Sequence, residues 1–402
     1  MAITQLPPLS LYVHFPWCVK KCPYCDFNSH AVKDSIPEAD YIDALIEDLE
    51  RELPSVWGRA ITSIFIGGGT PSLMSVEAVD RLLSAIRARL PFLADIEITM
   101  EANPGVVEAN KFKGYFDSGV NRISIGVQSF DDQFLLGLGR IHSGSESQRA
   151  FEIARDAGFK NINIDLMYAL PKQSVEQAMS DLELAIKLKP EHISWYQLTL
   201  EPNTVFHHKP PSHMATPDHL ADIEEQGLAL LSEENYQRYE VSAFSLAGEY
   251  PAWHNTNYWQ FGDYLGIGAG AHGKITRADT QQIARTTKRR SPKDYLNKKK
   301  SSKDQSRIVK PEELPLEFMM NAMRLKNGVD EDSFYQTTGI LLSQIDKPLK
   351  KCVDRGLLVL KENKLYPSEI GFQFLNEILS EFTDDRFKHL SEQNKIKITE
   401  IT

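Results

Sequence analysis

Three of the four cysteines of this 402-residue chain lie within eight positions and are its strongest chemical signal. The spacing Cys18-x3-Cys22-x2-Cys25 brings three soft thiolate ligands into one segment, and Pro23 keeps that segment from forming a regular helix. Thiolates suit iron–sulfur clusters or zinc. A [4Fe-4S] cluster normally takes four protein ligands, so three leave one iron with an exchangeable position. A zinc site completed by His14 or His30 is the alternative that the spacing leaves open.

Short apolar runs alternate with amphipathic segments over the first two hundred residues. The segments, such as 38–53, 76–90 and 174–188, have the periodicity of helices, and the runs have the Ile, Val, Phe and Leu content of buried parallel strands. Repeated strand–helix–strand units predict an α/β fold, either an open sheet or a partial (β/α)6 barrel resembling a TIM barrel. The six predicted strands are Leu9–Phe15, Ile61–Ile66, Ile96–Met100, Arg122–Val127, Asn161–Met167 and Ile193–Leu200.

Polar motifs follow these runs at matching ends. The cysteine loop follows the first, Gly67-Gly68-Gly69-Thr70-Pro71 the second and Glu101-Ala102-Asn103-Pro104 the third. Gln128 ends the fourth run, and Asp165 lies in the fifth. In a (β/α) barrel the carboxyl ends of the strands share one rim, where active sites are built. This placement favours the partial barrel over the open sheet.

Four regions follow from the pattern. Residues 1–205 are the predicted barrel, and 206–284 are an extension that contains an aromatic, glycine-rich stretch. Residues 285–310 are rich in Lys and Arg and are interpreted as a basic linker or loop. Residues 311–402 combine helical periodicity with a hairpin pattern, which predicts a smaller winged-helix-like domain.

Composition limits the class of protein. Apolar residues make up 42% and charged residues 25% of the chain, as in soluble globular proteins. The first residues do not resemble a signal peptide, and no apolar stretch is long enough to span a membrane, so a cytoplasmic location is expected. The net charge of −10 gives no general reason to expect nucleic acid as a partner. The basic stretch and the winged-helix pattern leave nucleic-acid binding as the weakest alternative.

The motifs resemble a known superfamily. The pattern Tyr12-x-His14-x-Pro16-x-Cys18-x3-Cys22-x2-Cys25, followed by the glycine run, is similar to that of radical SAM proteins. Further segments up to residue 203 look like the oxygen-independent coproporphyrinogen III oxidase-like group. The resemblance implies a [4Fe-4S] cluster held by the three cysteines and open to S-adenosylmethionine (SAM). It also implies an electron donor for the cluster.

The resemblance also carries individual residues. Tyr12, Gly68 and Glu101 match positions that line the cluster-bound SAM. A second SAM or substrate pocket of the oxidases is matched by Tyr24, Gly69, Thr70, Gln128, Arg140 and Asp165. A carboxylate there can hold a ribose or an ammonium group, and Arg140 can pair with a carboxylate.

Two features separate this chain from the oxidases. The oxidases have a further cysteine where Phe27 stands, so decarboxylation of coproporphyrinogen III is not expected. The segment His254-Asn255-x-x-Tyr258-Trp259 resembles the branch regarded as heme chaperones, which implies heme, a heme-acceptor protein and possible peripheral contact with membrane-bound acceptors. In this interpretation His254 ligates the heme iron. The alternative is a radical SAM oxidoreductase acting on coproporphyrinogen III or a related tetrapyrrole. Solvated loop positions are expected for His207, His208 and His213, and a buried one for Cys352.

Overall fold

The fold was examined in a computed structural model that describes residue 3 and residues 5–297 and 304–390. Six parallel strands pair in chain order: β1 (Leu9–Phe15), β4 (Ile61–Gly68), β5 (Phe92–Ala102), β6 (Arg122–Gln128), β7 (Ile162–Tyr168) and β8 (His192–Gln197). They form the middle of a twelve-stranded mixed sheet. The predicted α/β fold of parallel strands joined by helices is confirmed.

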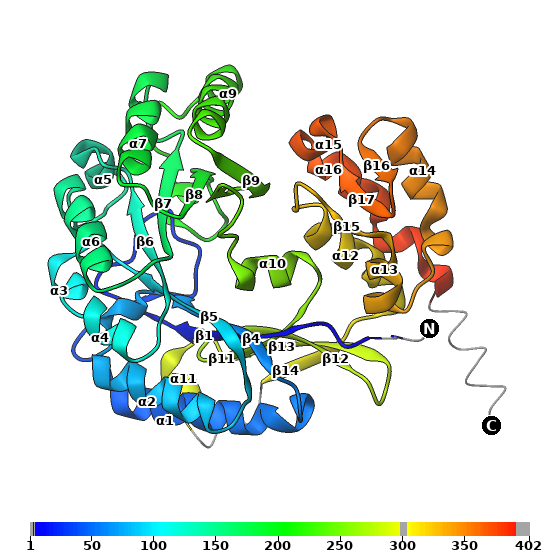
Figure 1. Ribbon diagram of the computed structural model, residues 1–402, viewed down its shortest axis with the longest axis horizontal. Helices are drawn as coiled ribbons and strands as arrows, with labels where there is room; N and C mark the ends of the chain where they lie inside the picture. Colours follow the sequence, from blue (N-terminus) through cyan, green and yellow to red (C-terminus); the bar gives the residue numbers. More distant parts are fainter. Residues whose placement is uncertain (1–2, 4, 298–303, 391–402) are drawn as a thin grey trace.

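Helices cover the outer face of these strands (Figure 1). Ser143 and Ser174 each accept a hydrogen bond from a backbone N–H of the first turn that follows, which fixes where α6 and α7 begin. Their apolar faces join a large core built on the strands. No helix in the described part of the chain is long and apolar enough to cross a membrane. The helices are α1 (Glu38–Glu52), α2 (Val76–Arg87), α3 (Val106–Ala109), α4 (Phe112–Asp117), α5 (Asp132–Gly137), α6 (Gly144–Asp156), α7 (Val175–Lys187), α8 (Val205–His208) and α9 (Pro217–Glu233).

The sheet continues beyond the six strands on both sides. Past β8 it adds β10 (Ala243–Leu246), which is antiparallel to β8, and then β9 (Tyr236–Glu240), which is antiparallel to β10. On the other side, β11 (Asp263–Ile267) runs parallel to β1, and β12 (His272–Arg277) and β13 (Gln282–Thr287) follow antiparallel. The extension is therefore part of the same sheet.

Helix α10 (Trp253–Trp259) lies between the sheet and the C-terminal domain (Figure 1). Its first turn begins against β5, because the Glu97 carboxylate accepts hydrogen bonds from the backbone N–H groups of Trp253 (3.0 Å) and His254 (3.3 Å). A carboxylate at a helix N-terminus also interacts favourably with the helix dipole. This contact holds the His-Asn-x-x-Tyr-Trp segment against the barrel.

The C-terminal domain has a core of its own, in which Phe318, Phe334 and Cys352 are fully buried. A three-stranded sheet follows the order β15-β17-β16, and β16 and β17 form the predicted hairpin. The elements are α12 (Leu314–Ala322), β15 (Val329–Asp330), α13 (Glu331–Thr338), α14 (Asp346–Asp354), β16 (Leu358–Lys361), β17 (Lys364–Pro367), α15 (Glu369–Gln373) and α16 (Leu375–Leu379).

The interpretation of residues 285–310 as a basic linker or loop is wrong for the described residues. They hold the end of β13, then α11 (Pro292–Leu296) and β14 (Gln305–Ile308), which pairs with β13. The reason is pairing of charge. The Lys288 ammonium is buried and donates to Asp48 (2.7 Å) and Glu52 (2.6 Å) of α1. A lysine buried in this way fixes the chain, because an unpaired buried charge is costly.

Candidate functional site

The three clustered cysteines line one cavity of about 270 Å³ at the carboxyl ends of the parallel strands. We call it the cluster cavity. Cys18 ends the short strand β2 (Trp17–Cys18), which pairs with β3 (His30–Ala31), and a turn in which the Cys25 N–H donates to the Cys22 carbonyl (3.2 Å) joins the other two. All three thiols are free of disulfides. The loop thus presents three sulfur ligands to one cavity.

Three free thiols that line one cavity suit a [4Fe-4S] cluster. Among the described residues, no three His, Cys, Asp or Glu side chains converge on one metal position. A cube needs no such convergence, because each thiolate binds a different iron at a different corner. His14 is engaged at both ring nitrogens, with the Tyr12 hydroxyl (2.9 Å) and the Asn28 carbonyl (3.0 Å), whereas Nε2 of His30 has no hydrogen-bond partner within the described structure. The zinc alternative therefore rests on His30.

The glycine run after β4 is folded against the cysteine loop. The N–H groups of Gly69 and Thr70 donate to the carbonyls of Phe15 (2.7 Å) and Trp17 (2.8 Å). Gly68 has φ of +114°, and a Cβ there would lie 2.4 Å from the His14 ring. No other residue type fits this position without displacing its neighbours. The glycines therefore let the backbone itself form one wall of the cavity.

Glu101 lies across from this turn. Its carboxylate accepts a hydrogen bond from the Gly68 N–H at 2.9 Å. Burial raises the pKa of Glu101 to about 7, against the opposing effect of that hydrogen bond. A carboxyl group with such a pKa can bind a cationic group or a hydroxyl group of a ligand.

Arg140 and Asp165 occupy the opposite wall. The Arg140 guanidinium donates to the Asn103 side chain and the Gly126 carbonyl, both at 2.8 Å, and one of its nitrogens lies 3.8 Å from the Cys22 sulfur. Asp165 accepts from the Ser124 hydroxyl (2.9 Å) and the Asn163 amide (2.8 Å), and burial raises its pKa. These groups are half-buried and held by hydrogen bonds, as preorganised binding groups are.

Gln128 completes this wall. Its backbone has φ of +71°, and its side-chain oxygen accepts a hydrogen bond from the Tyr196 hydroxyl at 2.7 Å. Tyr24 and Thr70 line the same cavity. The six residues matched to a second SAM or substrate pocket therefore all line the cluster cavity.

A second cavity of about 570 Å³ lies next to the first, and we call it the adjoining cavity. Phe27, Gly68 and Glu101 line both cavities, whereas Tyr12 lines only the adjoining one. The three residues matched to the cluster-bound SAM thus share this second space. Its remaining wall comes from α10 and the strands β11 to β13, through Tyr258, Tyr264, His272, Thr287 and Arg290.

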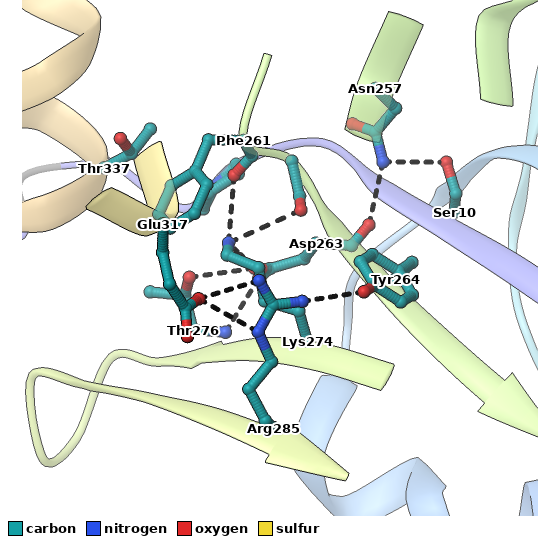
Figure 2. Close-up of polar contacts among 12 residues, drawn as sticks. Ser10, Asn257, Phe261, Asp263, Tyr264, Lys274, Thr276, Arg285, Glu317 and Thr337 are labelled. Carbon is teal, nitrogen blue, oxygen red and sulfur yellow. Dashed lines mark hydrogen bonds and ion pairs between the residues drawn. The ribbon is translucent and has the colours of Figure 1, made fainter. Parts of the chain in front are cut away.

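A network of ion pairs and hydrogen bonds holds that wall in place (Figure 2). Buried Asp263 accepts from the Lys274 ammonium (3.1 Å) and the Thr276 hydroxyl (2.9 Å). Arg285 donates to the Tyr264 hydroxyl (2.7 Å) and pairs with Glu317 of α12 (2.7 Å). The tyrosine at the cavity wall is therefore fixed from the barrel extension and from the C-terminal domain together.

His254 lies behind this wall rather than in it. The side chain is only 3% exposed and lines neither cavity. Its ring lies 5.1 Å from that of Phe65 and 5.0 Å from that of Tyr258. Nδ1 is 3.2 Å from the Ser63 hydroxyl, while Nε2 has no hydrogen-bond partner within the described structure. Burial lowers the pKa of His254 to about 3, so the imidazole is neutral.

Other sequence expectations have mixed outcomes. His207, His208 and His213 are exposed, as expected, but the first two lie in helix α8 and not in a loop. Cys352 is buried, as expected. The sequence analysis missed several residues of the two cavities, because none belongs to a motif of its own. Asn103 lies inside a noted segment, and Tyr196 lies in a predicted strand that ends at the rim. The missed residues are Asn28, Asn103, Tyr196, His272 and Arg290.

Comparison with known proteins fits this geometry. The profile of the Radical SAM superfamily matches residues 12–185, and that of the HemN C-terminal domain matches residues 309–374. The chain is 49% identical over 380 residues to the heme chaperone HemW of Escherichia coli, covering 94% of this chain and 99% of that protein. The chain belongs to the HemW family. The HemW of Haemophilus influenzae is 48% identical over 382 residues, and that of Bacillus subtilis 33% identical over 378.

The fold of this HemW-family chain is also that of a solved structure. Coproporphyrinogen III oxidase HemN of Escherichia coli, a radical SAM enzyme, superposes with a TM-score of 0.77 at 23% identity. The superposition covers 94% of this chain and 90% of HemN. At this identity the likeness establishes the fold alone. The predicted membership in the coproporphyrinogen III oxidase-like group of radical SAM proteins is confirmed.

Proposed function

We propose that this HemW-family protein is a heme chaperone that carries a [4Fe-4S] cluster and SAM and transfers heme to an acceptor protein. Relatives named heme chaperones match 94% of the chain, which supports the overall role. The observation that carries the cofactor part is geometric. Three free thiols, a glycine turn and a half-buried carboxyl group line one cavity at the strand ends.

In this proposal Cys18, Cys22 and Cys25 hold the cluster, which when bound would supply an electron to SAM. The glycine turn has no side chains, so a ligand can approach its backbone closely, and the Glu101 carboxylate, which accepts from the Gly68 N–H, lies beside that turn. Arg140 places positive charge 3.8 Å from the Cys22 sulfur, beside the proposed cluster. An electron donor for the cluster and a heme-acceptor protein complete the proposed set of partners.

The alternative is a radical SAM oxidoreductase acting on coproporphyrinogen III or a related tetrapyrrole. Both functions use the same cavity, so Phe27 is the residue that separates them. It is 57% exposed and stands between the two cavities, at the position where the oxidases have a cysteine. A phenyl ring has no proton or electron pair to give, which favours the chaperone.

Heme ligation by His254 stays a prediction. Its neutral imidazole and unpartnered Nε2 suit an iron ligand. Its burial behind Tyr258 means that helix α10 would have to shift before iron could reach it.

One experiment tests the proposed function as a whole. Anaerobically reconstituted protein is titrated with hemin, then mixed with a heme-free acceptor candidate while the Soret band is followed. We expect one heme per chain and loss of that heme to the acceptor. A deoxyadenosine assay on the same sample reports SAM cleavage. A protein that binds no heme at stoichiometric concentrations would contradict the proposal.

A further inference from the structure

A series of hydrogen bonds runs from the wall of the cluster cavity to the start of helix α10. The Asp165 carboxylate, which lines the cavity, accepts from the Asn163 amide at 2.8 Å. The Asn163 side-chain oxygen lies 2.6 Å from Nδ1 of His192, and Nε2 of that ring lies 2.9 Å from the Tyr239 hydroxyl. The same hydroxyl accepts from the backbone N–H of Ala252, the residue before α10, at 3.1 Å. We call these five residues the His192 network.

The state of the His192 ring gives these hydrogen bonds one direction. Burial and the charge of Arg122 lower the pKa of His192 well below its usual value, so the imidazole is neutral and has one donor and one acceptor nitrogen. The Asn163 amide nitrogen donates to Asp165, so its side-chain oxygen accepts, and Nδ1 of His192 carries the proton. Nε2 then accepts from the Tyr239 hydroxyl. Every donor in the network therefore points toward the Asp165 carboxylate.

Hydrogen bonds that share one direction respond to the charge at their end. Each bond polarises the next, so the Asp165 carboxylate strengthens the hydrogen bond between the Tyr239 hydroxyl and the Ala252 N–H. A ligand group that donates a hydrogen bond or brings positive charge to Asp165 competes for that carboxylate. The whole series is then weakened. The start of α10 keeps its hydrogen bond from the Trp253 N–H to Glu97 but is held less firmly by Tyr239.

The helix at the end of the network covers a histidine that faces neither cavity. His254 is 3% exposed, its ring lies 5.0 Å from that of Tyr258, and its Nε2 has no hydrogen-bond partner within the described structure. Iron can reach this nitrogen only if α10 moves. Such a movement has to break contacts at the start of the helix, and the hydrogen bond from Ala252 to Tyr239 is one of them. The network thus joins a ligand-binding carboxylate to the helix that covers His254.

We propose that His192 and Tyr239 are positioning residues through which a ligand at Asp165 loosens the start of α10 and so raises the affinity of His254 for heme iron. This inference rests on the proposed heme chaperone function and on heme ligation by His254. It leaves both cavities to the ligands already assigned to them. Because such coupling is reciprocal, heme raises the affinity for the ligand at Asp165 by the same factor. A protein that holds this ligand is then the form that takes up heme.

The test measures the factor by which SAM changes hemin affinity in cluster-loaded protein. For the wild type we expect saturating SAM to raise hemin affinity about fivefold or more. Tyr239→Phe removes one hydroxyl, so iron and sulfide content should stay while the factor falls to about one. Without SAM this variant should bind hemin at least as tightly as the wild type, because α10 has lost one of its contacts. A site damaged by misfolding would bind hemin less tightly.

A second buried tyrosine of the same strand provides the matched control. Tyr236 also lies in β9, and its hydroxyl donates to the Pro190 carbonyl at 2.7 Å, outside the His192 network. Tyr236→Phe therefore removes a hydroxyl of the same kind and should keep the wild-type factor.

Amide hydrogen exchange gives a measurement that needs no heme. SAM is expected to speed exchange of the backbone amides at 252–254 in the wild type and in Tyr236→Phe, because the start of α10 opens more often. In Tyr239→Phe and in Asp165→Asn, SAM should leave exchange there unchanged. A ligand that merely stiffens the protein would slow this exchange.

The outcomes separate this inference from the proposed function. If SAM does not raise hemin affinity in the wild type, or if Tyr239→Phe keeps the wild-type factor, the inference fails. A heme spectrum that His254→Ala leaves unaltered would also overturn it, since the iron ligand then lies elsewhere. In these cases heme binding by the wild type and its transfer leave the proposed function standing. A wild type that binds no heme defeats both.

Discussion

The two cavities share Gly68, Glu101 and Phe27 but are built in opposite ways. The cluster cavity is assembled from the ends of consecutive strands, and Glu101, Arg140 and Asp165 in it are already held by hydrogen bonds. The adjoining cavity takes its walls from segments more than two hundred residues apart, and its rim keeps an imidazole and a guanidinium in solvent. The first construction suits a resident cofactor that must be held in one geometry. The second suits a ligand that must arrive and leave.

The largest expected effect comes from a substitution in the cluster cavity alone. Cys22→Ala leaves two thiolates, which cannot hold a cube, so iron and sulfide should fall from about four of each per chain to near zero. Elemental analysis of anaerobically purified protein measures this. Cys352→Ala is the matched control, because Cys352 lies in the C-terminal core and should leave both contents unchanged. Stoichiometric zinc in the wild type would contradict the prediction.

A second substitution acts on the wall that both cavities share. Gly68→Val puts a Cβ at 2.4 Å from the His14 ring and forces a β-branched residue to φ of +114°. We expect the cluster to remain while the change that SAM causes in its EPR signal is lost. Gly137→Ala is the control, since a Cβ there meets no atom within 4 Å. A wild-type response to SAM in Gly68→Val would mean that the turn does not contact the ligand.

The pH dependence of SAM binding tests the same wall, with a smaller expected effect. Burial raises the pKa of Glu101 to about 7, so its carboxylate is lost as the pH falls through 7. If the carboxylate holds SAM, affinity for SAM should fall by up to about tenfold per pH unit below 7. Glu101→Gln should bind weakly with no such slope. Equilibrium binding to the cluster-loaded protein between pH 5.5 and 8, chosen to bracket about 7, measures both. Equal slopes in the two proteins would remove Glu101 from the SAM site.

The last prediction is that one activity is absent. With Phe27 in place of the oxidase cysteine, we expect no appreciable conversion of coproporphyrinogen III to protoporphyrinogen IX. The assay runs anaerobically with SAM and a reductant, and HemN from Escherichia coli serves as the positive control. Robust SAM-dependent turnover by this chain would contradict the proposed division between a cavity for a resident cofactor and a cavity for a ligand that arrives and leaves. It would promote the oxidoreductase alternative.

Sequence patterns predicted the parallel strands well, because each buried run reflects a strand covered on both faces. The first run coincides with β1, whereas the run at Ile96–Met100 covers only part of β5. Residues 93–95 of that strand are exposed, and Asp95 interrupts the apolar run just before Ile96. The cluster cavity was predictable for the same reason. Its residues belong to contiguous motifs at strand ends.

The adjoining cavity was not predictable from local pattern. His272 and Arg290 come together through the antiparallel register of β12 and β13 and through the Asn28 side chain, contacts that no local motif encodes. The basic stretch 285–310 was misinterpreted for the same reason, because its contacts are with residues far away in the sequence. Lys288 is ordered by carboxylates of α1, more than two hundred residues earlier in the chain. Composition shows a charge but does not show its partner.

That pairing has a consequence for association with polyanions. A protein gains affinity for a polyanion when its cations displace condensed counterions, and the salt dependence counts the cations involved. In the described part of the basic stretch, Lys288, Arg285 and Arg307 already face carboxylates of this chain. A cation that is already paired within the chain is less free to replace a counterion condensed on the polyanion. These three cations should therefore add little to the slope of log affinity against log salt for any acidic partner.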